Sequence, residues 1–147
     1  MAKIVRTPEE MFALGRALGA TCRAGDLILI SGPLGAGKTL LTQGIGSALG
    51  IEGITSPTFV IARSHQGKIP LIHVDAYRLI EGGHADLYLD DLDLDTATES
   101  AITVVEWGGA EAARLNEQRL EIDIDRSSDE RKVTFRPIGK RWEKFSL

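Results

Sequence analysis

Residues 32–39, with the sequence GPLGAGKT, constrain the fold of this chain more than any other segment. They match the phosphate-binding pattern GxxxxGK followed by Ser or Thr at every fixed position. The apolar run 27–30 before them suits a buried strand, and residues 38–49 after them read as a helix that ends at Gly50. A strand, a glycine-rich loop and a helix in that order predict a P-loop NTPase fold that binds a nucleoside triphosphate. A plain glycine-rich turn before a helix is the alternative interpretation.

The residue types in this loop suit the phosphates of a nucleotide. Glycine permits positive φ, so the backbone can curl its N–H groups around an anion, and the helix N-terminus adds partial positive charge. Lys38 is expected to reach the β- and γ-phosphates, and the Thr39 hydroxyl to hold magnesium. Nucleotide contacts are expected from Gly35, Ala36, Gly37, Lys38, Thr39 and Leu40.

Length and composition narrow the possible functions. A chain of 147 residues predicts one domain, residues 1–147, with no room for a separate catalytic domain. A net charge of −4 argues against a basic face that grips nucleic acid unaided, so a nucleic-acid role would need a partner. Cys22, the single cysteine, allows neither an internal disulfide nor a thiolate zinc cluster. The lack of an apolar span or signal-peptide pattern predicts a cytoplasmic protein that does not cross a membrane.

The order of predicted elements indicates a sheet flanked by helices. Thr7-Pro-Glu-Glu10 is typical of a helix start, with Thr7 as N-cap and Glu10 placed for a capping box, and the helix should run to about Leu18. Strands are predicted at 27–30, 59–63, 69–74, 102–105, 120–124 and 132–135, with 59–74 as a hairpin that turns at 66–68. The predicted fold class is α/β: three α/β/α layers around a mixed sheet of about seven strands. Ligands in such folds sit at the carboxyl ends of the strands.

Glu106 follows the apolar strand 102–105 directly. An acidic residue at the end of such a strand is where a Walker-B-type carboxylate holds magnesium, directly or through water. A solvated carboxylate at a strand end is the alternative. Because the phosphate loop is present, the metal role is preferred, and the neighbouring Trp107 is interpreted as a packing residue.

The segment 73–78, with the sequence HVDAYR, ends the strand predicted at 69–74. His73 and Asp75 share one side of an extended chain, so both could point at the same site. Asp75 is a candidate to bind a metal-bound water or orient the nucleophile, whereas a structural role is preferred for His73. Arg78 could pair with phosphate, with an acidic group of a partner, or in a surface ion pair.

The loop 55–59, with the sequence TSPTF, lies between the phosphate-loop helix and the predicted hairpin. Switch loops that sense the γ-phosphate occupy this position, and Thr58 or Ser56 would then reach the metal. An ordinary Ser-Pro turn explains the same residues equally well.

Taken together, the segments 32–39, 55–59, 73–78 and 104–108 resemble the TsaE family, also called YjeE. These are small bacterial ATPases of tRNA threonylcarbamoyladenosine biosynthesis. The likeness extends over nearly the whole chain, in the family's order and size. It implies a P-loop fold with a mixed sheet, ATP and Mg²⁺ as ligands, and slow hydrolysis in the isolated protein. It also implies a complex with TsaD and TsaB, in which TsaE supports threonylcarbamoyl transfer to tRNA without performing it.

The resemblance also implies roles for individual residues. It places Gly35 to Thr39 on the phosphates, Thr39 and Glu106 on magnesium, and Asp75 in the catalytic neighbourhood. Thr58 would belong to a switch-like loop, and Thr7 and Arg131 would lie near the adenine. The chain departs from the family pattern at 81–86, where EGGHAD stands in place of an acidic segment with a Leu-Gly turn.

Two other classes of function fit the phosphate loop. A small-molecule kinase would use it to transfer a phosphoryl group, although the chain has no arginine-rich lid and little length for an acceptor pocket. A nucleotide-dependent switch would use it for binding alone, without useful turnover. The chain also lacks the Asn-Lys-x-Asp element that reads guanine, which favours ATP.

Overall fold

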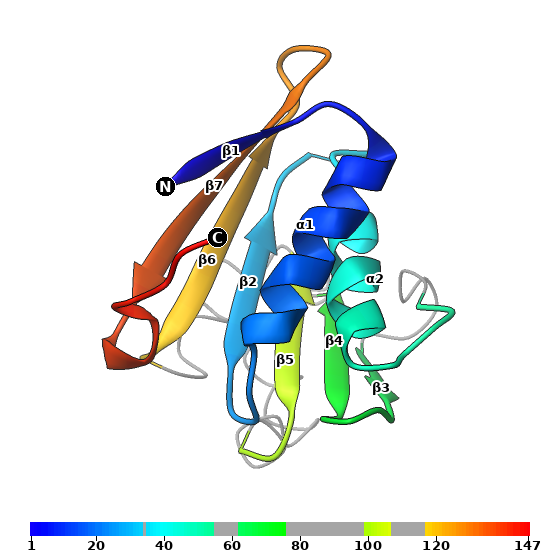
Figure 1. Ribbon diagram of the computed structural model, residues 1–147, viewed down its shortest axis with the longest axis vertical. Helices are drawn as coiled ribbons and strands as arrows, with labels where there is room; N and C mark the ends of the chain where they lie inside the picture. Colours follow the sequence, from blue (N-terminus) through cyan, green and yellow to red (C-terminus); the bar gives the residue numbers. More distant parts are fainter. Residues whose placement is uncertain (34, 55–61, 76–98, 107–116) are drawn as a thin grey trace, which may run out of the picture.

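The computed structural model of the chain describes residues 1–33, 35–54, 62–75, 99–106 and 117–147 (Figure 1). Seven strands form one sheet in the order β1-β7-β6-β2-β5-β4-β3. Their bounds are β1 Ala2–Val5, β2 Leu27–Ser31, β3 Ala62–His65, β4 Leu71–Asp75, β5 Ile102–Glu106, β6 Arg119–Asp125 and β7 Arg131–Ile138. The helices are α1 Pro8–Thr21, α2 Lys38–Ala48 and the short 3-10 helix η1 Lys140–Trp142.

The sheet is mixed, as the sequence predicts. β2 pairs in parallel with β6 on one side and β5 on the other, and β5 pairs in parallel with β4. β7 and β1 continue the sheet antiparallel beyond β6, and β3 closes the other edge antiparallel to β4. The central position of β2 explains its continuous apolar run, because strands covered on both faces need no polar alternation.

Helices α1 and α2 lie side by side against the same face of the sheet (Figure 1). Glycines let them approach closely, since a Cβ on Gly15 would collide with the carbonyl oxygen of Leu41, and one on Gly44 with that of Phe12. The core between helices and sheet includes Leu18, Leu41 and Ile45, none of them exposed to solvent. Helices of the predicted second layer are not seen among the described residues.

The observed elements differ from the prediction in several places. Strand β1 was not predicted; its four residues pair with β7, and the Phe135 N–H also donates to the Met1 carbonyl oxygen at 2.8 Å. Helix α1 continues past Leu18 to Thr21, and η1 was not predicted. A four-residue edge strand carries too few residues for a periodic signal to be detected.

Across the described residues, no helix has both the length and the apolar character that crossing a membrane would require.

Candidate functional site

The phosphate loop joins the end of β2 to the start of α2 at the carboxyl end of the parallel strands. Gly35 and Gly37 have φ of 77° and 112°, in the left-handed region that glycine adopts without steric cost. No described side chain caps the N-terminus of α2, and its first turn contains no acidic residue. The positive end of the helix dipole therefore faces the loop without a capping side chain, which suits an anion such as phosphate.

Lys38 is the first residue of α2, and its ammonium group is largely buried inside the loop. The residue is 6% exposed, and Nζ donates to the carbonyl oxygens of Gly32 at 2.8 Å and Pro33 at 2.9 Å. A buried charge needs polar partners, and these two carbonyls supply them. They also hold the ammonium beside the backbone that would surround a phosphate.

Three side chains meet beside the phosphate loop. They belong to Thr39 in the first turn of α2, Glu106 at the end of β5 and His73 on β4. Thr39 Oγ1 donates to Glu106 Oε1 across 3.4 Å, and His73 Nε2 lies 3.1 Å from the same oxygen. Glu106 is 5% exposed and His73 is fully buried. Register explains the meeting, since Glu106 pairs with Ile30 at the end of β2 and with Asp75 at the end of β4.

A hydroxyl and a carboxylate are hard oxygen ligands of the kind that magnesium prefers. Within the described part of the chain, no group of three or more His, Cys, Asp or Glu side chains could hold a metal ion. Magnesium in nucleotide sites is commonly bound by one or two protein oxygens together with substrate phosphates and water. Thr39 and Glu106, beside the phosphate loop, fit that kind of site.

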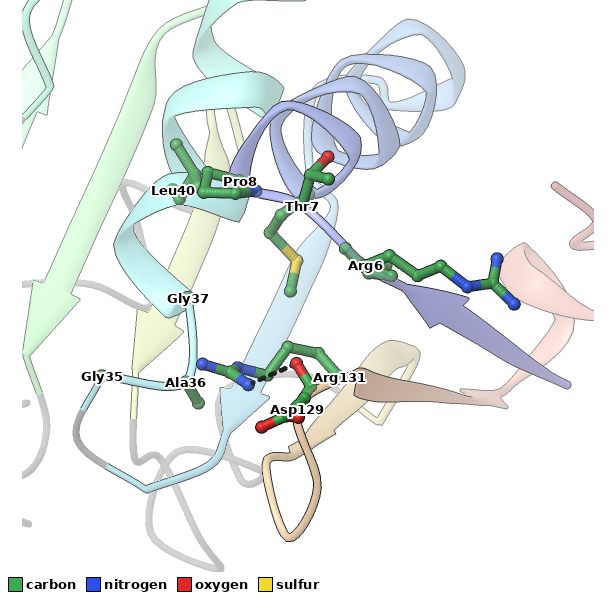
Figure 2. Close-up of a pocket in the computed structure, with 11 residues that line it drawn as sticks. Arg6, Thr7, Pro8, Gly35, Ala36, Gly37, Leu40, Asp129 and Arg131 are labelled. Atoms are coloured by element: carbon green, nitrogen blue, oxygen red, sulfur yellow. Dashed lines mark hydrogen bonds between the residues drawn. The ribbon is translucent and has the colours of Figure 1, made fainter.

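A cavity of about 160 Å³ adjoins the phosphate loop (Figure 2). The loop and α2 form one wall, the connection from β1 to α1 a second, and the turn between β6 and β7 a third. Thr7, Leu40 and Arg131, three of the predicted nucleotide contacts, all line it. In Figure 2 Arg131 extends toward the loop backbone near Ala36, while Arg6 points away from the cavity.

Hydrogen bonds fix two walls of this cavity. Arg131 Nη1 donates to the carbonyl oxygens of Ser128 at 3.4 Å and Asp129 at 3.2 Å, which holds the turn in place. Thr7 caps α1 as predicted, with its Oγ1 accepting from the Glu10 N–H at 3.1 Å. In a regular capping box the Glu10 carboxylate would accept from the N–H group of the N-cap residue, Thr7. Here it accepts instead from the N–H group of the preceding residue, Arg6, at 2.6 Å.

Several predicted residues cannot be placed in the site. The backbone of Asp75 lies beside that of Glu106, but its side chain is outside the described structure. Thr58 and Ser56 of the predicted switch loop also lie outside the described residues, as do Arg78 and Trp107. The structure therefore brings together the phosphate loop, Glu106, Thr7 and Arg131 from the predicted set.

Two polar residues from the segment between β6 and β7 lie near the loop and were not predicted. A Cβ on Gly35 would lie 2.6 Å from Arg126 Nη1, so the Arg126 guanidinium lies against the phosphate loop. Asp129 lines the cavity from the turn between β6 and β7. Both belong to a polar turn far from the loop in sequence, and only the parallel pairing of β6 with β2 brings that turn to the loop. No local sequence signal could have identified them.

Several known proteins are similar to this chain over most of its length. Residues 5–133 match the family model described as "Threonylcarbamoyl adenosine biosynthesis protein TsaE". The tRNA threonylcarbamoyladenosine biosynthesis protein TsaE of Streptomyces coelicolor is 50% identical over 141 residues, covering 90% of this chain and 93% of that protein. The protein of the same name from Bacillus subtilis is 39% identical over 139 residues, covering 92% and 85%.

Solved structures give the same answer for the fold. The crystal structure of YdiB from Bacillus subtilis superposes with a TM-score of 0.77 and 34% sequence identity, covering 97% of this chain and 88% of that one. The α/β fold with its seven-strand mixed sheet is therefore shared with a solved relative and is consistent with a P-loop NTPase.

Proposed function

Because this chain belongs to the TsaE family of tRNA threonylcarbamoyladenosine biosynthesis proteins, we propose that it is a magnesium-dependent ATPase of that pathway. It would act with TsaD and TsaB and contact tRNA only through their complex. The net charge of −4 supports this indirect role, since an acidic chain has little affinity for phosphate backbones by itself. We expect it to work in the cytoplasm, where tRNA and ATP are available.

One observation carries the proposal. The left-handed glycines of the phosphate loop, the buried Lys38 ammonium, and the contact between Thr39 and Glu106 lie at one end of the central strand β2. An anion-binding backbone, a fixed cation and a pair of hard oxygen ligands are what a magnesium–nucleotide complex requires.

Each part of the site has a proposed role. The backbone N–H groups of residues 35–39 and the Lys38 ammonium bind the phosphates, while Leu40, Thr7 and Arg131 surround the base. Thr39 and Glu106 hold magnesium, which when bound neutralises charge that develops on the phosphates. Asp75 orients the attacking water, and Thr58 responds to the γ-phosphate.

The test is threonylcarbamoyladenosine formation reconstituted with the cognate TsaB and TsaD, tRNA, ATP and a preformed donor of the threonylcarbamoyl group. Lys38→Ala removes charged hydrogen bonds worth about 1.5–3 kcal/mol, so ATP affinity should fall roughly 10- to 100-fold. Both Lys38→Ala and Glu106→Ala should lose multiple-turnover product formation. Lys144→Ala, which removes an exposed lysine, is the matched control and should retain full activity. Full multiple-turnover activity in the Lys38 or Glu106 variant would overturn the proposal.

The same assay separates the two alternative functions. A switch without useful turnover would support full product formation with a non-hydrolysable ATP analogue, whereas the proposed ATPase would not. A kinase would release a phosphorylated small molecule when nucleosides or sugars are supplied, and the proposed ATPase releases only ADP and phosphate.

A further inference from the structure

His73 is a polar residue in a fully apolar stretch of the core. It is 0% exposed, and its neighbours along β4, Leu71, Ile72 and Val74, are buried aliphatic residues. Its cross-strand partner on β5 is Val104, also fully buried. An aliphatic side chain would fill such a position without the cost of desolvating an imidazole ring. The presence of histidine here therefore needs an explanation other than packing.

The two ring nitrogens of His73 have different surroundings. Nε2 lies 3.1 Å from Glu106 Oε1, whereas Nδ1 is buried and has no hydrogen-bond partner among the described residues. A carboxylate oxygen can only accept, so with Glu106 as a carboxylate this contact assigns the ring proton to Nε2. The ring therefore contributes one directed N–H group to Glu106.

This N–H group has a specific effect on the Glu106 carboxylate. Both of its described donors, His73 Nε2 and Thr39 Oγ1, go to the same oxygen, Oε1. Holding one oxygen from two directions restricts rotation of the carboxylate about its side-chain bonds. It also leaves the second oxygen, Oε2, for a further ligand.

We propose that His73 is a positioning residue that holds Glu106 in the orientation in which Glu106 and Thr39 can bind magnesium together. This inference rests on the proposed function, because it gives the carboxylate a metal to hold. Residues behind metal ligands commonly fix the ligand's orientation, and their loss typically weakens metal binding roughly 10- to 100-fold. The sequence alone favoured a structural role for His73, because the contact depends on the register of β4 against β5.

The experiment compares His73→Leu, which removes the N–H donor, with His73→Gln, whose amide N–H can replace it. Binding of a fluorescent ATP analogue is measured first in EDTA and then as a function of Mg²⁺ concentration. In EDTA both variants should bind the nucleotide like the parent protein. The Mg²⁺ concentration that produces half of the full change in nucleotide binding should rise roughly 10- to 100-fold in His73→Leu. In His73→Gln it should return toward the parent value.

Thr103→Val is the matched control. Thr103 is fully buried on β5, and its hydroxyl has no hydrogen-bond partner among the described residues. Removing that hydroxyl deletes a buried polar atom three positions from Glu106 without touching it, so the Mg²⁺ dependence should not change. Parental Mg²⁺ dependence in a folded His73→Leu protein would overturn the inference, as would equal losses in His73→Leu and His73→Gln.

A spectroscopic measurement on the parent protein covers the case in which His73→Leu does not fold. Spectra of the protein with ¹⁵N-labelled histidine should show His73 with its proton on Nε2, and a ring protonated only on Nδ1 would contradict the inference. Failure of the inference is distinguishable from failure of the proposed function. If His73→Leu does not change the Mg²⁺ dependence, the Lys38 and Glu106 variants are still expected to lose product formation in the reconstituted assay.

Discussion

At the scale of single residues, buried charge marks the site. The buried ionisable side chains among the described residues are Asp26, Lys38, His73 and Glu106. All but Asp26 gather at the phosphate loop, where each has a polar contact. Ionisable groups are rarely buried unless they are paired, so this concentration indicates a functional site and not a packing accident. The motif predicted Lys38 and Glu106, but it could not predict the partner of His73.

Cys22 behaves differently from these residues. Burial, reinforced by the negative charge of Asp26, raises the pKa of the Cys22 thiol to about 12. Its Sγ donates to the Leu18 carbonyl oxygen at 3.4 Å. The group is therefore a neutral thiol at physiological pH and has no role as a nucleophile.

Gly35→Ala should weaken nucleotide binding, and Gly50→Ala should not. Both glycines have φ of 77°, so either alanine costs roughly 1–2 kcal/mol of folding stability in left-handed backbone. A Cβ at Gly35 would also lie 2.6 Å from Arg126 Nη1, whereas nothing lies within 4 Å of one at Gly50. Urea unfolding should show similar losses for both variants. Fluorescent-ATP titration should show weaker binding only for Gly35→Ala; equal affinities would contradict this.

At the scale of elements, the sequence predicted helices and strands most accurately where a residue pattern fits only one type of secondary structure. The buried run of β2, the capped start of α1 and the helix after the phosphate loop were all predicted, as were the alternating strands β6 and β7. The short strand β1 was missed because its stability comes from hydrogen bonds to β7, a partner remote in sequence. Strand β3 extends to His65, two residues past its predicted end, and residues 59–61 of its predicted range lie outside the described residues.

Gly15→Ala should destabilise the protein through the contact between α1 and α2. The new methyl group would meet the Leu41 carbonyl oxygen, so the helices must separate. Overpacking of this kind costs about 1–3 kcal/mol. Replacing glycine by alanine inside a helix gains roughly 1 kcal/mol in helix propensity. Because the clash is with backbone, we expect a cost near the upper end of the overpacking range, which exceeds this gain. Thermal unfolding measures the loss.

Ala17→Ser, at an exposed position of the same helix, is the control and should change stability by only about 0.5 kcal/mol. ATP affinity should fall in Gly15→Ala as well, since α1 carries Met11, which lines the cavity with Thr7. An unchanged melting temperature would show that the two helices can separate at little cost.

At the scale of the whole molecule, ion pairs link segments that are distant in the chain. Arg141 of η1 donates to both carboxylate oxygens of Asp26, just before β2, at 2.8 Å each. Their side chains are 18% and 2% exposed, and the guanidinium also stacks on Trp142 at 4.2 Å from the ring centroid. The sequence predicted a mixed sheet but not this link, because ion pairing between remote residues leaves no periodic pattern.

Arg141→Met should lower the free energy of unfolding by about 3–5 kcal/mol, because it leaves the Asp26 carboxylate buried without its charge partner. Arg136→Met is the matched control. It removes an arginine that is 72% exposed in its pair with Glu121, and such surface pairs contribute about 0–1 kcal/mol. Urea unfolding of the two variants tests the difference. Similar losses would show that the buried pair is no stronger than the exposed one.

The position of β2 in the sheet has a consequence for how the protein is made. β2 carries the phosphate loop, yet its neighbours are β5, at Ile102–Glu106, and β6, at Arg119–Asp125. A ribosome therefore releases the loop long before it releases the strands that hold the loop in place. The last part of β6 must emerge before residues 32–39 can take their final shape, so chains truncated before Arg119 would carry the motif without the site.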